Sequence, residues 1–185
     1  ISNDDTRHYL NGVFLHITES QSKTYLTGVA TDSHRLSSSS IEIEKGTNFN
    51  SLILPRKTIF QLCTLLQETQ EKVAVQNSDT KIQFRIGKTK LISKVIDGKF
   101  PDYTKVVPAS NDKTLTVLSK DFIDSVERVT TVSIDRKEGV KLVINKENIK
   151  LSVNSTNSGD GNEVIKANYS SNELTISFNS KYLID

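Results

Sequence analysis

The sequence predicts an α+β fold built from repeated units of strands and helix. Most of the chain alternates apolar and polar residues with a period of two, which is typical of half-buried strands. Only two segments, which begin near Pro55 and Ser119, place apolar residues at helical spacing. The segment Gly12-Val13-Phe14-Leu15-His16-Ile17 recurs 127 residues later as Gly139-Val140-Lys141-Leu142-Val143-Ile144, and this similarity indicates an internal repeat.

The first half of the sequence contains strands on both sides of one helix. Alternation predicts strands at 10–18, 24–31, 41–43, 52–54, 72–76, 81–86 and 90–96. We expect the helix to begin at Pro55, because a proline at the first helical position gives up no hydrogen bond. The apolar stripe of this helix contains Ile59, Leu62, Cys63 and Leu66. We therefore expect Cys63 to be a core residue and not a reactive thiol.

The second half begins after the segment 98–108, where one glycine, two prolines and the lack of helical period predict a domain boundary. Ser119 is a candidate N-cap for a helix with Phe122, Val126 and Val129 on its apolar stripe. We expect strands at 114–118, 140–144, 149–153, 163–168 and 174–178, a polar loop at 154–162, and the start of another helix at 182–184.

The order of these elements predicts two units that are cut at different places. In the second unit, a strand and a helix at 114–131 precede the repeated Gly-Val strand. The first unit begins at that strand without them. We therefore expect 1–103 to be a unit that lacks its opening strand and helix, and 104–185 to be the first part of the next unit.

The composition limits the class of protein. The formal net charge of +2 is too small for a protein that grips phosphates tightly, but it allows weak, sliding contact with nucleic acid. The single cysteine cannot form an internal disulfide and fits a reducing compartment. The sequence has neither a signal peptide nor an apolar run near the roughly 20 residues that span a bilayer. We expect a cytoplasmic protein without membrane contact, and the first residue, Ile1, predicts a fragment.

The sequence offers little for catalysis. It contains no P-loop, no G-x-G-x-x-G motif and no G-x-S-x-G motif. Its three histidines lack metal-ligand spacing, and His16 alternates with apolar strand residues, which favours a structural role. Asp32 and His34 could act as a base and its orienter, but no activated nucleophile accompanies them, and local hydrogen bonding at a strand end is the simpler explanation. We expect no enzyme, no metal and no cofactor.

Two helix faces are modestly basic. Arg56 and Lys57 lie on one helix, and Lys120 and Arg128 lie on the other. If both helices face DNA, they would contact phosphates without reading bases, which suits a protein that slides. An ordinary solvated helix face explains the same residues, and the sequence by itself favours that simpler explanation.

Three motifs together carry a family resemblance. The segments Arg7-His8-Tyr9-Leu10-Asn11-Gly12, Ala30-Thr31-Asp32-Ser33-His34-Arg35-Leu36 and Asp97-Gly98-Lys99-Phe100-Pro101-Asp102-Tyr103 resemble, in this order, three runs of the bacterial sliding clamp, the β subunit of DNA polymerase III. The resemblance implies repeated DNA-clamp domains with antiparallel sheets outside and helices lining one face. Residues 1–103 would be the middle domain, and 104–185 the first part of the C-terminal domain. The implied function is a non-catalytic subunit that encircles duplex DNA and tethers the replicative polymerase for processive DNA replication.

The resemblance also implies a pocket for short clamp-binding peptides from DNA polymerase III subunits, the clamp loader and repair polymerases. The matching positions are Leu10, Thr31, Ser33, His34, Arg35, Leu36, Pro101, Lys105 and Val106. Apolar walls with a polar rim suit such a ligand. Ser33 stands where glycine is frequent in the family, and Lys105 stands where arginine is frequent, so the peptide preference could differ.

Contacts with DNA and with a second subunit follow from the same resemblance. The residues expected to contact duplex DNA without sequence specificity are Arg7, His8, Tyr9, Arg56, Lys57, Lys120 and Arg128. The residues expected at the interface of a full-length homodimer are Thr131, Val132, Asp160 and Glu163. This edge is often more acidic in the family, which puts electrostatic dimer contacts in doubt, and we expect the fragment alone to be monomeric and to enclose no DNA. The alternative is a protein-interaction module of repeated α+β units without a DNA role.

Overall fold

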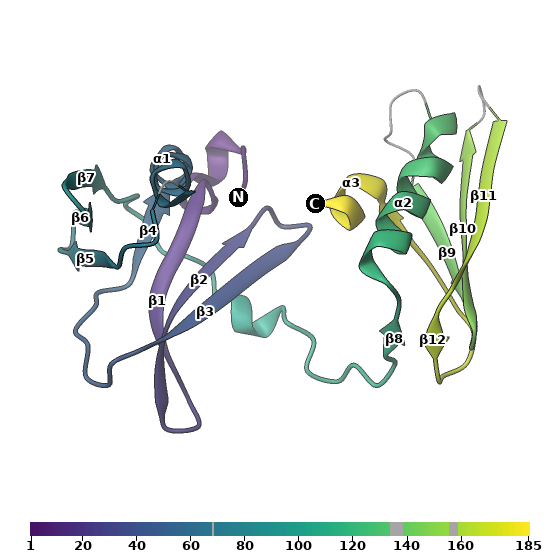
Figure 1. The fold of residues 1–185 in the computed structure, drawn as a ribbon, viewed down its shortest axis with the longest axis horizontal. Helices are drawn as coiled ribbons and strands as arrows, with labels where there is room; N and C mark the ends of the chain where they lie inside the picture. Colours follow the sequence, from purple (N-terminus) through teal and green to yellow (C-terminus); the bar gives the residue numbers. More distant parts are fainter. Residues whose placement is uncertain (68, 134–138, 156–158) are drawn as a thin grey trace. The chain divides into compact units, whose positions relative to one another are not determined.

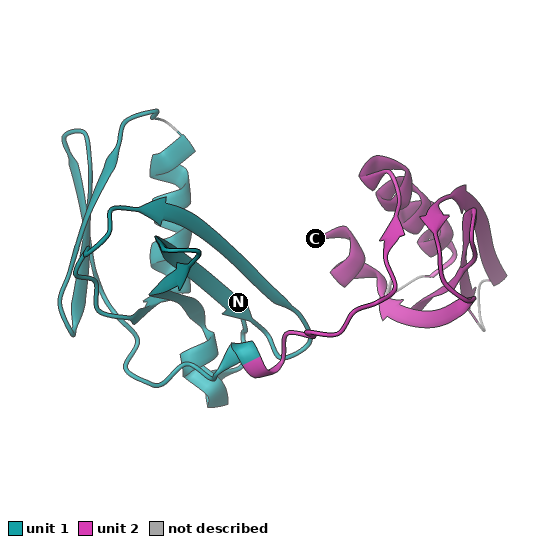
Figure 2. Cartoon of the chain, turned by 90° about the horizontal axis from the view of Figure 1, so that it is seen from below, with its two compact units in different colours: residues 1–104 teal, residues 105–185 magenta. Residues whose placement is uncertain are grey.

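The computed structural model describes residues 1–67, 69–133, 139–155 and 159–185. Within this part the chain divides into two compact units, which we call unit 1 (Ile1–Thr104) and unit 2 (Lys105–Asp185) (Figure 2). The division falls inside the segment 98–108, which carries the boundary signals in the sequence. Both units combine antiparallel sheets with helices, which confirms the α+β fold class (Figure 1).

Unit 1 contains two antiparallel sheets and one α-helix. Its elements are the 3₁₀ helix η1 (Asp5–Leu10), β1 (Gly12–Ser20), β2 (Lys23–Thr31), β3 (Leu36–Ile43), β4 (Leu52–Pro55), α1 (Arg56–Gln67), β5 (Val73–Asn77), β6 (Lys81–Ile86) and β7 (Thr89–Lys94). One sheet has the order β3-β2-β1-β4 and the other the order β5-β6-β7. An isolated bridge connects Ile53 of β4 with Ile96, which follows the end of β7. A second 3₁₀ helix, η2 (Tyr103–Lys105), follows at the division between the units.

The two faces of β4 supply two separate cores of unit 1, because alternate residues of a strand point to opposite faces. Leu52 and Leu54 are buried with Ile82 and Phe84 in one cluster, against which Ile59 and Leu62 of α1 pack. Ile53 points the other way and is buried with Leu10, Val29 and Phe100 in a second cluster, which we call the Leu10 cluster. The helix covers the first cluster only.

The buried face of α1 differs from the predicted stripe. Ile59 and Leu62 pack inward as expected, but Cys63 is exposed and Leu66 is 39% exposed, so the prediction of a core cysteine is wrong. The inward face instead includes Thr58, whose Oγ1 lies 2.7 Å from Ser93 Oγ. Since successive residues of an α-helix are about 100° apart, Cys63 turns away from the sheet as soon as Leu62 faces it.

Two element boundaries in unit 1 also differ from the sequence prediction. Pro55 ends β4 opposite Gly12, and α1 begins one residue later at Arg56. The strand predicted at 41–43 starts already at Leu36, because the serine run 37–40 pairs along its whole length with β2. One of these serines, Ser40, places its hydroxyl 2.8 Å from the hydroxyl of Thr27, which gives the polar strand side-chain hydrogen bonding across the pair.

Unit 2 repeats the arrangement with one helix before the sheet. Its elements are β8 (Leu115–Thr116), α2 (Ser119–Val129), the 3₁₀ helix η3 (Thr130–Val132), β9 (Gly139–Ile144), β10 (Asn148–Ser155), β11 (Gly159–Lys166), β12 (Asn168–Tyr169), β13 (Leu174–Asn179) and α3 (Ser180–Ile184). The main sheet has the order β11-β10-β9-β13, and β12 pairs with β8. Val126 and Val129 are buried against this sheet with Phe122 beside them, which confirms the predicted stripe of α2.

Two predictions at the ends of these elements are wrong. Leu118, and not Ser119, is the N-cap of α2, and its side chain makes no capping hydrogen bond. The predicted polar loop at 154–162 is largely a continuation of strands, since β10 extends to Ser155 and β11 starts at Gly159; residues 156–158 lie outside the described part. Gly161 on β11 lies so close to the carbonyl oxygen of Val129 that a Cβ atom there would clash with it. The glycine therefore allows the end of α2 to pack directly on the strand.

The internal repeat is confirmed by the topology of the two units. β1 and β9, which carry the repeated sequence, occupy the same position in their four-stranded sheets. Gly12 faces Pro55 at the end of β4, and Gly139 faces Asn179 at the end of β13. A helix follows directly in both cases, α1 after β4 and α3 after β13. The similarity of six residues thus reflects one supersecondary unit used twice.

Candidate functional site

The polar run 32–35 of the sequence forms the turn between β2 and β3. The Oδ1 atom of Asp32 accepts hydrogen bonds from the backbone N–H groups of His34 and Arg35, both at 3.0 Å. Its Oδ2 atom accepts a third from Nε of Arg35 at 3.1 Å. Partial burial by itself would raise the pKa of Asp32, but these three hydrogen bonds outweigh it and hold the pKa below its ordinary value. Asp32 therefore stabilises the turn, which confirms local hydrogen bonding as the explanation of this motif.

Ser33 occupies the most constrained position of this turn. Its φ of 77° lies in the left-handed region, which favours glycine. Its N–H donates to Thr31 Oγ1 at 3.1 Å, and its hydroxyl accepts a hydrogen bond from Nη1 of Arg7 at 2.6 Å. The side chain of Ser33 thus has a hydrogen-bond partner that a glycine could not have.

Arg7 is held from both sides by this contact and by η1. Its Nε donates to Asp4 Oδ2 at 2.8 Å, while Asp4 also accepts from the hydroxyl and the N–H of Thr6. The hydrogen bonds from the Thr6 hydroxyl and from Arg7 lower the pKa of Asp4 to about 2. Consequently Arg7, predicted to contact DNA, and Ser33, predicted to line the peptide pocket, form one connected network of side chains.

Two of the apolar residues predicted for the pocket, Leu10 and Leu36, come together. Leu10 is buried in the Leu10 cluster, and Leu36 packs against the same cluster from the start of β3. Phe100 belongs to this cluster as well, so that Pro101, which is exposed, directly follows a buried anchor. Lys105 ends η2, and Val106, which is 70% exposed, follows it in unit 2.

A row of aromatic rings supports this segment, and sequence reasoning did not find it. The ring of Phe14 stacks on His16 at a centroid distance of 4.6 Å and on Phe100 at 4.9 Å. His16 Nδ1 lies 3.1 Å from the carbonyl oxygen of Ile17, and Nε2 lies 3.1 Å from the hydroxyl of Tyr103. These contacts confirm a structural role for His16. The signal in the sequence is the pair of aromatic rings two residues apart on one strand face.

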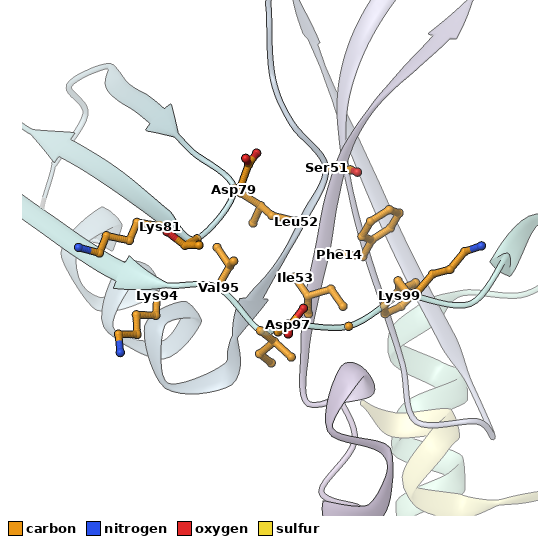
Figure 3. Close-up of a pocket in the computed structure, with 14 residues that line it drawn as sticks. Phe14, Ser51, Leu52, Ile53, Asp79, Lys81, Lys94, Val95, Asp97 and Lys99 are labelled. Atoms are coloured by element: carbon orange, nitrogen blue, oxygen red, sulfur yellow. The ribbon is translucent and has the colours of Figure 1, made fainter.

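A cavity in unit 1 lies beside this row and was also missed. It has a volume of about 760 Å³ and lies where the two sheets meet at the bridge of Ile53 and Ile96. Figure 3 shows Phe14, Leu52 and Val95 around it, whereas the amine ends of Lys81 and Lys94 extend away from it. Its lining includes Phe100 but none of the nine residues predicted for the peptide pocket. The cavity and the predicted pocket are therefore neighbours that share the Phe100 segment.

The basic residues predicted to contact DNA differ in whether their charged groups already interact with other side chains. Arg56 and Lys57 are exposed on α1, and the guanidinium of Arg56 lies 5.4 Å from the ring centroid of Phe60. Lys120 is exposed on α2. On the same helix, Arg128 donates two hydrogen bonds to Glu163, from Nε at 3.0 Å and from Nη2 at 2.6 Å.

The pair of Arg128 and Glu163 changes the electrostatics of the second helix. The hydrogen bond with Arg128 lowers the pKa of Glu163, and the same bond raises the pKa of Arg128. Both groups remain ionised near neutral pH and compensate each other. The acidic residue predicted for the dimer edge therefore neutralises a basic residue predicted for DNA.

The remaining predicted residues lie on η1 and near the edge of unit 2. The imidazole of His8 has Nε2 3.1 Å from the carbonyl oxygen of Asp97, and its ring meets Tyr9 edge-on at 5.9 Å. Thr131 is exposed and Val132 is half-buried, both on η3, while Asp160 lies with Glu163 on β11, an edge strand of the main sheet.

Metal-binding clusters and membrane-spanning helices were sought among the residues that the structure describes. Within the ranges that the structure describes, no three His, Cys, Asp or Glu side chains gather in a way that could hold a metal ion. Among the same residues, none of the helices has the length and apolar character needed to cross a membrane.

Comparison with known families decides the relationship. The model of the central domain of the DNA polymerase III beta subunit matches residues 1–102, and the model of its C-terminal domain matches residues 104–185. The chain belongs to the DNA polymerase III beta subunit family.

Individual members of the family resemble the chain along its whole length. The beta sliding clamp of Caulobacter vibrioides is 38% identical over 186 residues, which are 100% of this chain and 50% of that protein. The beta sliding clamp of Escherichia coli K12 is 30% identical over 185 residues, again 100% of this chain and 50% of the relative. The chain therefore spans about half the length of these relatives.

Solved structures agree with this assignment. A DnaN sliding clamp from Bartonella birtlesii, bound to griselimycin, superimposes with a TM-score of 0.93 at 42% identity and covers 100% of this chain and 50% of its own. The Caulobacter crescentus beta sliding clamp superimposes with a TM-score of 0.95 at 38% identity, over 100% of this chain and 49% of that one. The repeated α+β units of the chain are thus units of a DNA-clamp fold.

Proposed function

We propose that the chain is part of a sliding clamp that captures short peptides of its partners at the Leu10 cluster. The observation that carries this proposal is the convergence of Leu10, Leu36 and the Phe100–Pro101 segment beside the turn at Ser33. Apolar anchors next to a rigid polar turn suit an extended peptide with a few large apolar side chains. The expected partners are DNA polymerase III subunits, the clamp loader and repair polymerases.

Peptide binding to the full-length protein tests this proposal. A fluorescently labelled clamp-binding peptide from a DNA polymerase III subunit should bind. Leu36→Ala should weaken its binding about tenfold or more, since fully burying a leucine side chain contributes on the order of 1.5–3 kcal/mol. Leu174→Ala is a matched control, because Leu174 is also a half-buried leucine at the start of a strand, but in unit 2. Binding that is absent, or equally affected by both variants, would refute the proposal.

The proposed role with DNA is a non-catalytic one. We propose that the full-length protein is a cytoplasmic homodimer that encloses duplex DNA and gives the polymerase processivity. The exposed Arg56 and Lys57 of α1 support weak contact with phosphates, which carries no sequence preference. Binding of duplex DNA should therefore weaken steeply with salt and be alike for unrelated sequences. Measurable selectivity for one sequence would contradict this role.

We also propose that unit 1 is a central clamp domain without the strand and helix that open unit 2. In unit 2, α2 packs on β10 and β11, and Val140 and Leu142 are buried. The residues at the same register of unit 1, Val13 and Leu15, are only half-buried, and Ile41 on β3 is 61% exposed. With Cys63→Ser to remove the native thiol, Ile41→Cys should react quickly with a thiol reagent in the 185-residue chain and slowly in the full-length protein. Equal rates would contradict this domain assignment.

A further inference from the structure

We propose that His16 is a positioning residue for the peptide site, through its hydrogen bond to Tyr103. The inference rests on the proposed peptide-binding function and adds a residue that lies outside the predicted pocket. His16 lies on β1, while the residue that it places, Pro101, lies 85 positions further along the chain. The link between them is the row of aromatic rings formed by Phe14, His16, Phe100 and Tyr103, which we call the aromatic row.

The aromatic row holds the segment 100–103 at both of its ends. At the first end, the ring of Phe100 stacks on Phe14 with planes only 6° apart and is 6% exposed. At the other end, the hydroxyl of Tyr103 bonds to Nε2 of His16 at 3.1 Å, and the two rings lie 5.7 Å apart. Pro101 lies between these two anchors and is itself exposed. Its position therefore depends on contacts made by residues outside the predicted pocket.

The hydrogen bonds of His16 also indicate which of its two ring nitrogens carries the hydrogen. The carbonyl oxygen of Ile17 can only accept, so the nitrogen 3.1 Å from it, Nδ1, must carry the hydrogen. In the neutral ring Nε2 is then an acceptor, and the Tyr103 hydroxyl donates to it. Stacking on Phe14 at an interplanar angle of 22° fixes the plane of the imidazole so that this lone pair points at the tyrosine. For the neutral ring, the geometry thus favours the Nδ1–H tautomer.

The bond between His16 and Tyr103 explains how a residue on β1 affects a peptide site to which it does not itself belong. Without the bond to His16, the segment would keep the stacking of Phe100 and the packing of Tyr103 on the Leu10 cluster, but it would lose the polar contact that fixes the position of the Tyr103 hydroxyl. Peptide binding would then have to order the segment again, which costs affinity without removing any direct contact. One hydrogen bond of ordinary strength corresponds to a loss of about two- to tenfold in affinity.

The test uses variants of the full-length protein and the same labelled clamp-binding peptide from a DNA polymerase III subunit. His16→Phe keeps the stacking but removes the acceptor, and Tyr103→Phe removes only the hydroxyl. Each should weaken binding about two- to tenfold, and the double variant should be no weaker than either single one, because both remove the same bond. His16→Gln, whose carbonyl oxygen can accept from Tyr103, should restore most of the affinity.

A control on the same strand separates positioning from general destabilisation. Thr18→Val removes the hydrogen bond between the hydroxyls of Thr18 and Thr27, which are 2.6 Å apart on β1 and β2 and do not contact the 100–103 segment through any described bond. It should leave peptide affinity unchanged. The imidazole ¹⁵N signals of His16, assigned by their loss in His16→Phe, should show the Nδ1–H tautomer and should shift in Tyr103→Phe.

The possible outcomes distinguish the proposal from the function on which it rests. If the wild-type protein binds the peptide while His16→Phe and Tyr103→Phe bind equally well, the positioning role is overturned and the proposed function stands. His16 ¹⁵N signals that do not shift in Tyr103→Phe, or a Thr18→Val effect as large as that of His16→Phe, also overturn the positioning role. A folded wild-type protein that binds no peptide overturns the proposed function and the positioning role together.

Discussion

The turn at Ser33 allows a quantitative prediction, because one residue there combines backbone strain with a specific side-chain bond. A non-glycine residue in the left-handed region costs roughly 1–2 kcal/mol. The bond from Arg7 to the Ser33 hydroxyl, which is partly exposed, offsets on the order of 0.5–1.5 kcal/mol of this cost. Ser33→Ala keeps the strain and loses the bond, whereas Ser33→Gly loses both. We therefore expect Ser33→Gly to be close to wild type in the stability of the turn and Ser33→Ala to be about 1 kcal/mol less stable.

Hydrogen exchange measures this stability locally. The N–H groups of His34 and Arg35, which donate to Asp32, exchange only when the turn opens. A difference of about 1 kcal/mol corresponds to roughly fivefold slower exchange in Ser33→Gly than in Ser33→Ala. Ser22 provides the matched control, since it also has a positive φ, 64°, but lies in the β1–β2 turn at the other end of the strand pair. Ser22→Gly should stabilise its own turn clearly. Exchange in Ser33→Ala as slow as in Ser33→Gly would refute the strain argument.

Three further predictions concern other parts of the structure. Gly161→Ala should destabilise unit 2 by about 1–3 kcal/mol in chemical denaturation, because its Cβ clashes with the carbonyl oxygen of Val129; a stability equal to wild type would show that the helix end can shift freely. Glu163→Gln should tighten binding of duplex DNA and steepen its salt dependence by releasing Arg128, whereas an unchanged slope would mean that Arg128 does not reach phosphates. The pKa of Asp4 is lowered to about 2, so the ionised carboxylate stabilises the fold fully above pH 4, and this stabilisation is lost between about pH 4 and 2. Thermal unfolding of wild type and Asp4→Asn measures the effect. A difference in thermal stability that persists at pH 2 would contradict this prediction.

The sequence predicted best what depends on local pattern. The repeat that begins at Gly12 and Gly139 correctly identified equivalent strands, and the stripe of Val126 and Val129 correctly gave the buried face of α2. It failed for Cys63, because apolar residues at helical spacing define a stripe only to within one position, and the sheet beneath α1 decides which edge is covered. Likewise the serine run after Leu36 gives no strand signal by itself, since its pairing with β2 is a tertiary effect.

The candidate site shows the same limit at a finer scale. The family motifs predicted Leu10 and Leu36 as pocket residues, and in the structure both belong to or pack on the Leu10 cluster. They could not show that His16 reaches Tyr103, because that contact joins residues 87 positions apart and depends on how the chain returns to the first sheet. Nor could they show that Ser33 would bind Arg7, since the two lie in different motifs that meet only in the folded unit.

The pair of Arg128 and Glu163 sets two predicted roles against each other. A DNA phosphate and the Glu163 carboxylate can each accept two parallel hydrogen bonds from a guanidinium. Arg128 can therefore bind only one of them in this bidentate way at a time. The carboxylate is already in place at 2.6 Å, whereas a phosphate must be brought from solution with its counterions. In the same way, the Glu163 carboxylate attracts a basic residue of a second subunit less strongly, because its charge is already partly compensated by Arg128. The arrangement therefore favours Arg56 and Lys57 on α1 over Arg128 as DNA contacts, and it leaves Asp160 as the stronger acidic candidate at the edge of unit 2.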